Sequence, residues 1–401
     1  MTESFEEKGA VLIWPTNNKR AMDVSPRKYA ARLKKTFRQL KKQFRSLEAG
    51  QRRIVRLNLA DLKRRAAGIR LLFSQPKRYH EVDDMFFGFE ELPLFGKEYW
   101  FLKFTGGAED LRQLILTFGR SAGDVKVNRT KMKSSLEAGA EKECMVIGWC
   151  FDKTKKVFAD ASQKVAVSRR KTNVISSDSE KTGVSFSLSG AYPSYSLEIK
   201  HKGKKVADLK MSKPKKGRPF EMSQFYKGNL GFQLINIYFD FQGELYGKKL
   251  GGKCYLQKVI GVGPFVPWRW ARFIFRNGSV FDAFVMNVEA LGLKQPVYSL
   301  VSFQDEKGKF WQKRTSVNFE KIRGKNPRWV VSAPDGKMVL EAESYSRHPF
   351  VFSSRYSGKF TYLEYLSKVN DFYLEKGGKH WSLAGCGPAS GLVEDAYGFM
   401  L

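Results

Sequence analysis

The sequence predicts a mainly β protein of the sandwich or barrel type. From about Met85 onward, short runs of alternating, β-branched or aromatic residues are separated by turn-forming residues, with few helical stripes. Hydrophobic residues make up 42% and aromatic residues 14% of the 401 residues, which suffices for packed cores and excludes a disordered polycation. Many antiparallel strands at short spacing are typical of β-sandwiches and β-barrels.

We expect two folded β domains behind an N-terminal basic arm. At roughly 100 to 200 residues per domain, a chain of 401 residues holds two or three domains. The composition changes from basic to β-like near residue 80, and a Pro-rich link lies near residue 265. The expected boundaries are 1-80 for the basic amphipathic helical arm, 81-265 for the first β domain and 266-401 for the second.

The positive charge is concentrated in the arm. The whole sequence has a net charge of +31 and a pI of about 9.9. Between Arg27 and Arg78 lie eighteen basic residues, opposed only by Glu48 and Asp61. The charge therefore indicates a local module attached to an aromatic β body.

The first part of the arm predicts an amphipathic helix with defined ends. Ser25 is a good N-cap, Pro26 suits the first helical position, and Gly50 follows the last turn. From Tyr29 to Leu47, apolar residues recur at steps of three and four, which places them on one stripe. Lys and Arg occupy the rest of the helix surface.

A polybasic amphipathic segment suits an anionic membrane surface or an acidic partner. A second expected helix, over Leu59 to Phe73, continues the basic segment. Nucleic acid is the other natural partner, but no zinc finger or RNP-like strand accompanies the segment, so we rank it below the membrane surface. Packing of residues 26-78 against the protein's own body is an open alternative.

The sequence predicts neither secretion by a standard signal nor a membrane-spanning helix. No run of about 18 uncharged apolar residues occurs, and Met1 to Gly9 contains three glutamates instead of a basic and apolar leader. Four cysteines are too few for a disulfide scaffold, which favours a reducing compartment. We expect a cytoplasmic protein, peripheral to a membrane.

No cofactor or metal site is predicted. The four histidines and four cysteines lack the C-x-x-C or H-x-x-x-H spacing of metal sites. The stretch from Gly385 to Gly391 lacks G-x-G-x-x-G spacing and carries Pro388 where a helix would begin, so it does not predict a nucleotide site.

The β region contains clear strand and hairpin signals. Arg276-Asn277-Gly278-Ser279 predicts a type I′ turn, and Pro334-Asp335-Gly336 and Glu306-Lys307-Gly308 predict turns of the same kind. The basic run from Lys200 to Arg218 crosses a hairpin and predicts a sheet edge protected by lysines. The expected strands are Tyr99–Phe104, Leu114–Phe118, Met145–Phe151, Val184–Leu188, Gly231–Phe241, Trp270–Phe275, Val280–Asn287, Val297–Phe303, Trp329–Ser332 and Met338–Glu343.

The most informative segment runs from Gly251 to Met286. It reads Gly251-Gly252-Lys253-Cys254-Tyr255-Leu256-Gln257-Lys258-Val259-Ile260-Gly261, then Pro264, Pro267, Trp268-Arg269-Trp270 and the Asn277-Gly278 hairpin. This pattern suggests a strand that leaves one barrel and a strand that enters another. It resembles the lipocalin-like superfamily of tocopherol cyclase, carotenoid hydratase (hydroxyneurosporene synthase) and AttH-type proteins, which share a G-x-x-Y-x-x-K-x-x-G-like strand, a Pro-rich link, W-x-W and a hairpin.

Two further motifs carry the resemblance, which covers about residues 81 to 401. Glu98-Tyr99-Trp100-Phe101 resembles the E-W-W-Y opening strand of the superfamily, and Gly391 to Gly398 resembles its closing G-x-x-E-x-x-x-G strand. The resemblance implies two tandem lipocalin-like β-barrel domains with an apolar cavity for an isoprenoid or another lipid. This chain lacks the His/Asp-rich strand of the carotenoid hydratases, and Lys258 brings it closer to tocopherol cyclase.

The chemistry that the resemblance implies requires particular groups. Protonating a prenyl alkene needs a carboxylic acid kept neutral by an apolar wall, and aromatic faces that stabilise a carbocation. The catalytic candidates are Asp282, Asp240, Tyr255 and Glu394, with Glu289 and Asp395 as further carboxylates, and the substrate-binding candidates are Trp100, Trp268, Trp270, Lys258 and Tyr397.

These residues also have structural roles open to them. A Trp in a barrel often belongs to the core or caps the barrel end, Asp282 suits a cross-strand pair with Arg272 or Arg276, and Lys258 suits an exposed strand position. Our hypothesis is a membrane-peripheral protein that binds a lipid or isoprenoid and cyclises, hydrates or isomerises it. The alternatives are a non-catalytic lipid carrier of the same fold and a nucleic-acid-binding protein acting through its basic arm.

Overall fold

The computed structural model describes residues 79–92, 96–123, 125–132, 139–169, 172–227, 230–263, 265–290, 293–354 and 358–400. These residues belong to one compact unit, Asn58–Leu401. The basic segment 26-78, with both expected helices, lies outside the described residues, and its partners stay predictions.

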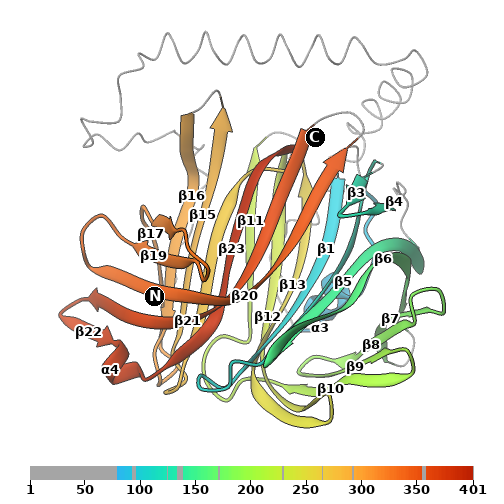
Figure 1. The fold of residues 1–401 in the computed structure, drawn as a ribbon, viewed down its shortest axis with the longest axis horizontal. Helices are drawn as coiled ribbons and strands as arrows, with labels where there is room; N and C mark the ends of the chain where they lie inside the picture. Colours follow the sequence, from blue (N-terminus) through green and yellow to red (C-terminus); the bar gives the residue numbers. More distant parts are fainter. Residues whose placement is uncertain are drawn as a thin grey trace. The chain divides into compact units, whose positions relative to one another are not determined.

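The first sheet of this unit is antiparallel and closes into a barrel (Figure 1). Its 11 strands are β1 (Gly96–Gly106), β2 (Gln113–Ser121), β5 (Glu141–Asp152), β6 (Thr154–Arg169), β7 (Asn173–Ser179), β8 (Val184–Ala191), β9 (Ser194–His201), β10 (Lys204–Ser212), β11 (Phe220–Lys227), β12 (Leu230–Leu245) and β13 (Lys248–Val262). They follow the order β10-β9-β8-β7-β6-β5-β2-β1-β13-β12-β11, and β10 also pairs with β12. This last pairing closes the barrel.

The second sheet contains 12 strands. They are β3 (Val125–Val127), β4 (Thr130–Met132), β14 (Trp268–Phe275), β15 (Val280–Ala290), β16 (Leu293–Gln304), β17 (Phe310–Arg314), β18 (Asn318–Ile322), β19 (Arg328–Ser332), β20 (Met338–Ser354), β21 (Gly358–Lys376), β22 (Lys379–Ser382) and β23 (Ala389–Met400), with the short helix α4 (Leu383–Cys386) before β23. Their main order is β17-β16-β15-β14-β23-β21-β20-β19-β18, and β3 joins through β20. The sheet curves around its own apolar core.

The predicted mainly β fold is confirmed. Each expected strand lies within a strand of the structure. The strand β13 belongs to the first sheet and β14 to the second, so the segment around the W-x-W motif leads from one sheet into the other, as the sequence predicts.

A short helix, α3 (Tyr79–Phe86), precedes the first strand. Its Val82 is buried in the core of the barrel, and its Asp83 accepts a hydrogen bond from the hydroxyl of Tyr195. The sequence patterns predict β texture from about Met85, where this helix ends, but they do not predict the helix itself. A helix of 8 residues is too short for its apolar residues to show the helical period clearly, so the sequence pattern does not distinguish it from a strand.

Side-chain alternation gives each strand of the barrel an inner and an outer face. On β1, Trp100 and Phe104 join the core inside the barrel, whereas Tyr99 and Lys103 contact the second sheet. Apolar side chains from α3 and from most strands of the first sheet fill the described barrel interior.

The three expected hairpins form, but not through type I′ turns. In the first, the Phe275 carbonyl accepts from the Gly278 amide at 2.9 Å. Gly278 has a φ of 89°, whereas Asn277 keeps a negative φ, and a type I′ turn requires positive φ at both central residues. Gly308 and Gly336 repeat the pattern with φ of 84° and 70°. In each hairpin, a longer loop that ends at a Gly with positive φ replaces the expected two-residue turn. The Gly is the last residue of the turn, one position later than the type I′ turn would place it.

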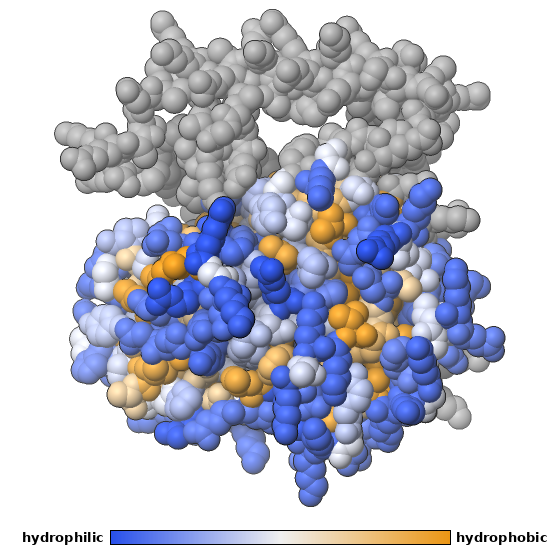
Figure 2. Space-filling view, viewed as in Figure 1, coloured by the Kyte–Doolittle hydropathy of each residue, from blue (hydrophilic) through white to orange (hydrophobic). Residues whose placement is uncertain are grey.

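The lysine-rich run from Lys200 to Arg218 does not protect a free sheet edge. Residues 207–212 of β10 pair with β9 on one side and with β12 on the other. The predicted edge was wrong because the barrel closes at this strand. The lysines of the run instead lie on the outer surface, which carries hydrophilic residues around small hydrophobic patches on the face shown in Figure 2.

Among the helices of the described residues, none has both the length and the apolar character needed to span a bilayer.

Candidate functional site

The outer face of the barrel packs against the second sheet, and we call this contact the inter-sheet seam. Ligand sites in proteins occur preferentially at such interfaces between folded units. Two apolar clusters combine residues of both sheets and define the seam. Their buried members are Tyr99, Val125, Val127, Met132, Met145, Ile147, Phe265, Phe350, Phe352, Phe360, Tyr362, Ala396 and Met400 in one cluster and Ile115, Trp149, Tyr255, Trp270, Leu366 and Leu392 in the other.

One lysine, two glutamates and one tyrosine form a buried polar cluster in the seam, which we call the glutamate cluster. Lys103 of β1 donates to Glu394 of β23 and lies 3.3 Å from Glu364 of β21. The Tyr362 hydroxyl donates to Glu364 Oε1 at 2.7 Å and accepts from Lys103 Nζ at 3.3 Å. Glu364 and Glu394 are register partners on neighbouring strands. One buried cation therefore faces two carboxyl groups.

Three indole rings surround the glutamate cluster. Trp149 Nε1 donates to Glu364 Oε2 at 2.9 Å, and Trp268 Nε1 donates to Glu394 Oε2 at 2.8 Å. Lys103 Nζ lies 4.9 Å from the centre of the Trp270 ring, within cation–π distance. Each carboxyl group is thus oriented by an indole N–H.

Burial raises the pKa of Glu364 above its ordinary value. Lys103 opposes this rise in pKa, and the negative charge of Glu394 adds to it. The direction of this pKa change favours the protonated, neutral form of Glu364, which is the form that a general acid needs.

Beside the glutamate cluster, Arg272 of β14 organises a second group of polar side chains. Its Nη1 donates to Asp282 Oδ2 at 2.6 Å, across two directly paired strand positions. Its guanidinium lies 4.7 Å from the ring centre of Tyr238 and 5.3 Å from that of Tyr255. The cross-strand pair that the sequence offered as the structural alternative for Asp282 is present.

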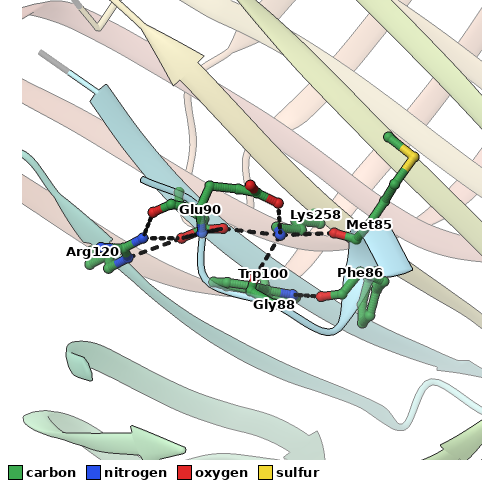
Figure 3. A network of polar contacts seen from close by, with 8 residues as sticks. Met85, Phe86, Gly88, Glu90, Trp100, Arg120 and Lys258 are labelled. Atoms are coloured by element: carbon green, nitrogen blue, oxygen red, sulfur yellow. Dashed lines mark hydrogen bonds and ion pairs between the residues drawn. The ribbon is translucent and has the colours of Figure 1, made fainter. Parts of the chain in front are cut away.

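Trp100 and Lys258, which the sequence nominates for substrate binding, lie on the other face of their strands, inside the barrel (Figure 3). Trp100 Nε1 donates to the Phe86 carbonyl at 2.9 Å. Lys258 Nζ donates to the carbonyls of Met85 and Gly88 at 2.8 and 2.7 Å. Lys258 is fully buried, so the alternative of an exposed strand lysine was wrong.

Glu98 completes this network inside the barrel, which we call the barrel network. Its Oε1 lies 3.0 Å from Lys258 Nζ, and its Oε2 accepts from Arg120 Nε at 3.0 Å. Glu90 contributes a second carboxylate, 3.4 Å from Lys258 Nζ. Because each charge here has an opposite partner and Lys258 also binds chain carbonyls, the network ties the end of α3 to β1 and β13.

The other nominated residues lie away from the glutamate cluster. Asp240 is partly exposed and forms a cross-strand ion pair with Lys253 at 2.9 Å. Tyr397 is 45% exposed. Asp395 points away from its neighbour Glu394 and pairs with two cations of the second sheet. The side chain of Glu289 lies outside the described residues.

The structure thus brings Tyr255, Glu394, Trp268 and Trp270 together in the seam, with Asp282 beside them. Sequence reasoning missed three members of the glutamate cluster and one of the indoles around it. They are Lys103, Glu364, Tyr362 and Trp149. A single lysine inside the apolar run of β1, and a glutamate between aromatic and aliphatic residues of β21, were the available signals of buried charge.

Two small cavities lie along the seam and share Lys253, Cys254 and Arg272 in their walls. The inner one, of about 10 Å³, also touches Lys103 and Trp270. The outer one has a volume of about 30 Å³. Each holds about one water molecule, so a larger ligand requires seam side chains to move.

In the part of the chain that the structure describes, no three His, Cys, Asp or Glu side chains are grouped closely enough to bind a metal ion. The four cysteines are buried free thiols.

No family model and no curated protein matches the chain. Among solved structures, it is similar to a candidate AttH protein from Nitrosomonas europaea, with a TM-score of 0.46 and 10% identity over 75% of this chain and 92% of that one. It is also similar to CghA in complex with Sch210972 (TM-score 0.40, 9% identity, 76% and 88% covered) and to kievitone hydratase from Nectria haematococca (0.39, 12%, 80% and 93%).

The first of these structures carries the name of one group that the sequence motifs resemble. At TM-scores below 0.5, the three likenesses transfer no activity or substrate to this chain. The fold of this chain is established by the strand pairing of its own two sheets.

Proposed function

We propose that this protein binds an apolar lipid- or isoprenoid-type molecule in the inter-sheet seam and protonates it from the glutamate cluster. The observation that carries the proposal is the placement of Glu364 and Glu394 around Lys103, beneath three indole rings. The reaction class is acid-catalysed cyclisation, hydration or isomerisation of an alkene.

The cluster supplies the groups that this chemistry needs. Glu364, whose pKa burial raises, gives its proton to one alkene carbon, and the other carbon becomes a carbocation next to the faces of Trp268 and Trp270. Lys103 and the indole N–H of Trp149 stabilise the carboxylate that remains. Loss of a proton to a carboxylate completes a cyclisation or isomerisation, and attack by water followed by loss of its proton completes a hydration.

Glu364→Gln should lower turnover by about 10²- to 10⁴-fold and leave ligand binding intact, because the amide keeps the shape but carries no acidic proton. The measurement starts from lipid extracted from the purified full chain and identified by mass spectrometry. That lipid is then incubated with the protein in D2O, and deuterium on its carbon skeleton is counted. Glu375→Gln, on the exposed end of the same strand, is the control and should match the unsubstituted protein.

The non-catalytic carrier predicts a different result. Lipid would be extracted from all three proteins, and none of them would introduce deuterium. Absence of any extracted or added apolar ligand would contradict both versions of the proposed function.

We further propose that residues 26-78 hold the protein on an anionic membrane surface at the cytoplasmic side. The support is the predicted amphipathic helix and its lysines and arginines. In flotation, the full chain should rise with vesicles that contain phosphatidylserine and stay behind with neutral phosphatidylcholine vesicles. A chain lacking residues 1–78 should lose flotation. Binding to RNA or DNA instead of vesicles would favour the nucleic-acid alternative.

A further inference from the structure

The outer seam cavity has a basic wall. It lies between the loop of residues 214–218 from the barrel and strands β14 to β17 of the second sheet. Four cations line it, and Asp282 is its single acidic lining residue. The cations are Lys216, Arg218, Lys253 and Arg272.

Neighbouring acids leave part of this positive charge unbalanced. Asp240 pairs with Lys253 at 2.9 Å, and Asp282 pairs with Arg272. Glu221 faces the same region and accepts a hydrogen bond from Tyr238 at 3.1 Å. Even when all three acids are ionised, the four cations leave an excess of positive charge. Arg218 contributes most directly to this excess, because its side chain is exposed and its guanidinium lies 3.9 Å from the centre of the Phe310 ring.

The loop that carries two of these cations is fixed across the seam. Lys216 Nζ donates to the Glu306 carbonyl at 3.1 Å. A Cβ on Gly217, whose φ is 93°, would overlap the side-chain amide of Gln304, so the loop approaches the second sheet closely. The basic wall is therefore built by both sheets together, and it exists only when they are packed.

Arg272 joins the basic wall to the apolar part of the seam. The outer and inner cavities both touch it, and the inner cavity continues to Trp270 and Leu392. Asp282 accepts from Arg272 through Oδ2 at 2.6 Å, and this pair holds the guanidinium where the two cavities meet.

We propose that the basic wall binds the oxyanion head of an amphiphile, a phosphate or a carboxylate, whose apolar tail lies in the inter-sheet seam. This inference rests on the proposed function, because it adds a head group to the apolar ligand of that site. Arg272 and Arg218 donate to the oxyanion, and the Asp282 carboxylate holds Arg272 in place through Oδ2. Lys216 and Arg218 are exposed, so their side chains adjust to the head group without repacking either core.

Calorimetric titration of the full chain with three probes at fixed ionic strength tests this inference. The probes are farnesyl phosphate, farnesol and inorganic phosphate. Farnesyl phosphate should bind at least tenfold more tightly than farnesol. The double substitution Lys216→Gln and Arg218→Gln should remove most of that difference, and Lys210→Gln, an exposed lysine on β10, should preserve it. Both substituted sites are on the surface, so the variants should fold.

Each other outcome overturns the inference in a recognisable way. Equal affinity for farnesol and farnesyl phosphate contradicts the oxyanion site while leaving the apolar ligand of the proposed function in place. A preference for farnesyl phosphate that survives the double substitution assigns the effect to the general positive charge of the chain. Binding of inorganic phosphate without any gain from the farnesyl chain contradicts the tail in the seam, and with it the proposed function.

Discussion

Glu98→Gln should lower the free energy of unfolding by about 3 to 5 kcal/mol, because it removes the carboxylate shared by two buried cations. Lys258 and Arg120 are both fully buried and lie 3.0 and 2.9 Å from the Glu98 carboxylate. After the substitution, Glu90 is the remaining carboxylate of the barrel network. Burying two cations against one partly exposed carboxylate costs more than the lost hydrogen bonds alone.

Urea unfolding followed by tryptophan fluorescence measures this loss. Glu109→Gln is the matched control, since Glu109 pairs with Arg276 on the surface with both side chains more than 60% exposed, and it should change stability by less than about 1 kcal/mol. Adding Lys258→Met to Glu98→Gln should recover part of the loss, because it removes one unpaired cation. Equal effects of the Glu98 and Glu109 substitutions on the free energy of unfolding would show that the barrel network contributes little to stability.

Acidification should destabilise the protein through His348. This residue of β20 is buried, its two ring nitrogens have no hydrogen-bond partner in the described structure, and its ring lies against Trp149. Burial, with a smaller effect of Lys155, lowers the pKa of His348 to about 4. Glu364 is its partner position on β21.

The direction of the effect follows from proton binding. The unfolded chain binds a proton at His348 below about pH 6.5, whereas the folded protein does so only near pH 4, so stability falls as the pH drops from 6.5 to 4. The full difference amounts to about 3 kcal/mol. The raised pKa of Glu364 acts in the opposite direction, because the folded state then binds its proton more readily at acid pH.

His348→Phe separates the two contributions. Phe keeps an aromatic ring on Trp149 but takes up no proton, so the variant should gain about 2 to 3 kcal/mol relative to the unsubstituted protein between pH 7.5 and pH 4.5. The contribution of Glu364 is common to both proteins and cancels in this comparison. Denaturant unfolding at the two pH values gives the result, and parallel pH dependences would contradict the assignment to His348.

Contacts that are local in the chain were predictable. Arg272 and Asp282 lie on the two strands of one hairpin, so a cross-strand pair between them was an open alternative before the structure was known. The turn between these strands was predicted in place, although its type was wrong. The motif strands also led to Glu394, Trp268 and Trp270, which the seam brings together.

Contacts between the sheets were not predictable from these patterns. Strand β1 is buried on both faces, so its sequence does not alternate between polar and apolar residues, and nothing local places Trp100 in the barrel and Lys103 in the seam. Glu364 was missed for the same reason. Its cation lies on another sheet, and no local spacing connects the two residues.

The long separation between Lys103 and Glu394 also bears on the order in which the chain folds. The two residues are 291 positions apart, so at about 5 to 20 residues per second the ribosome makes Glu394 roughly 15 to 60 s after Lys103. In the part of this interval that follows synthesis of β13, the outer face of the new barrel, with its tyrosines and the indole of Trp149, has no complete second sheet to cover it. A charged lysine in the middle of that face opposes its association with other nascent chains. The residue that ends as the buried cation of the seam thus begins as the group that keeps an unfinished barrel soluble.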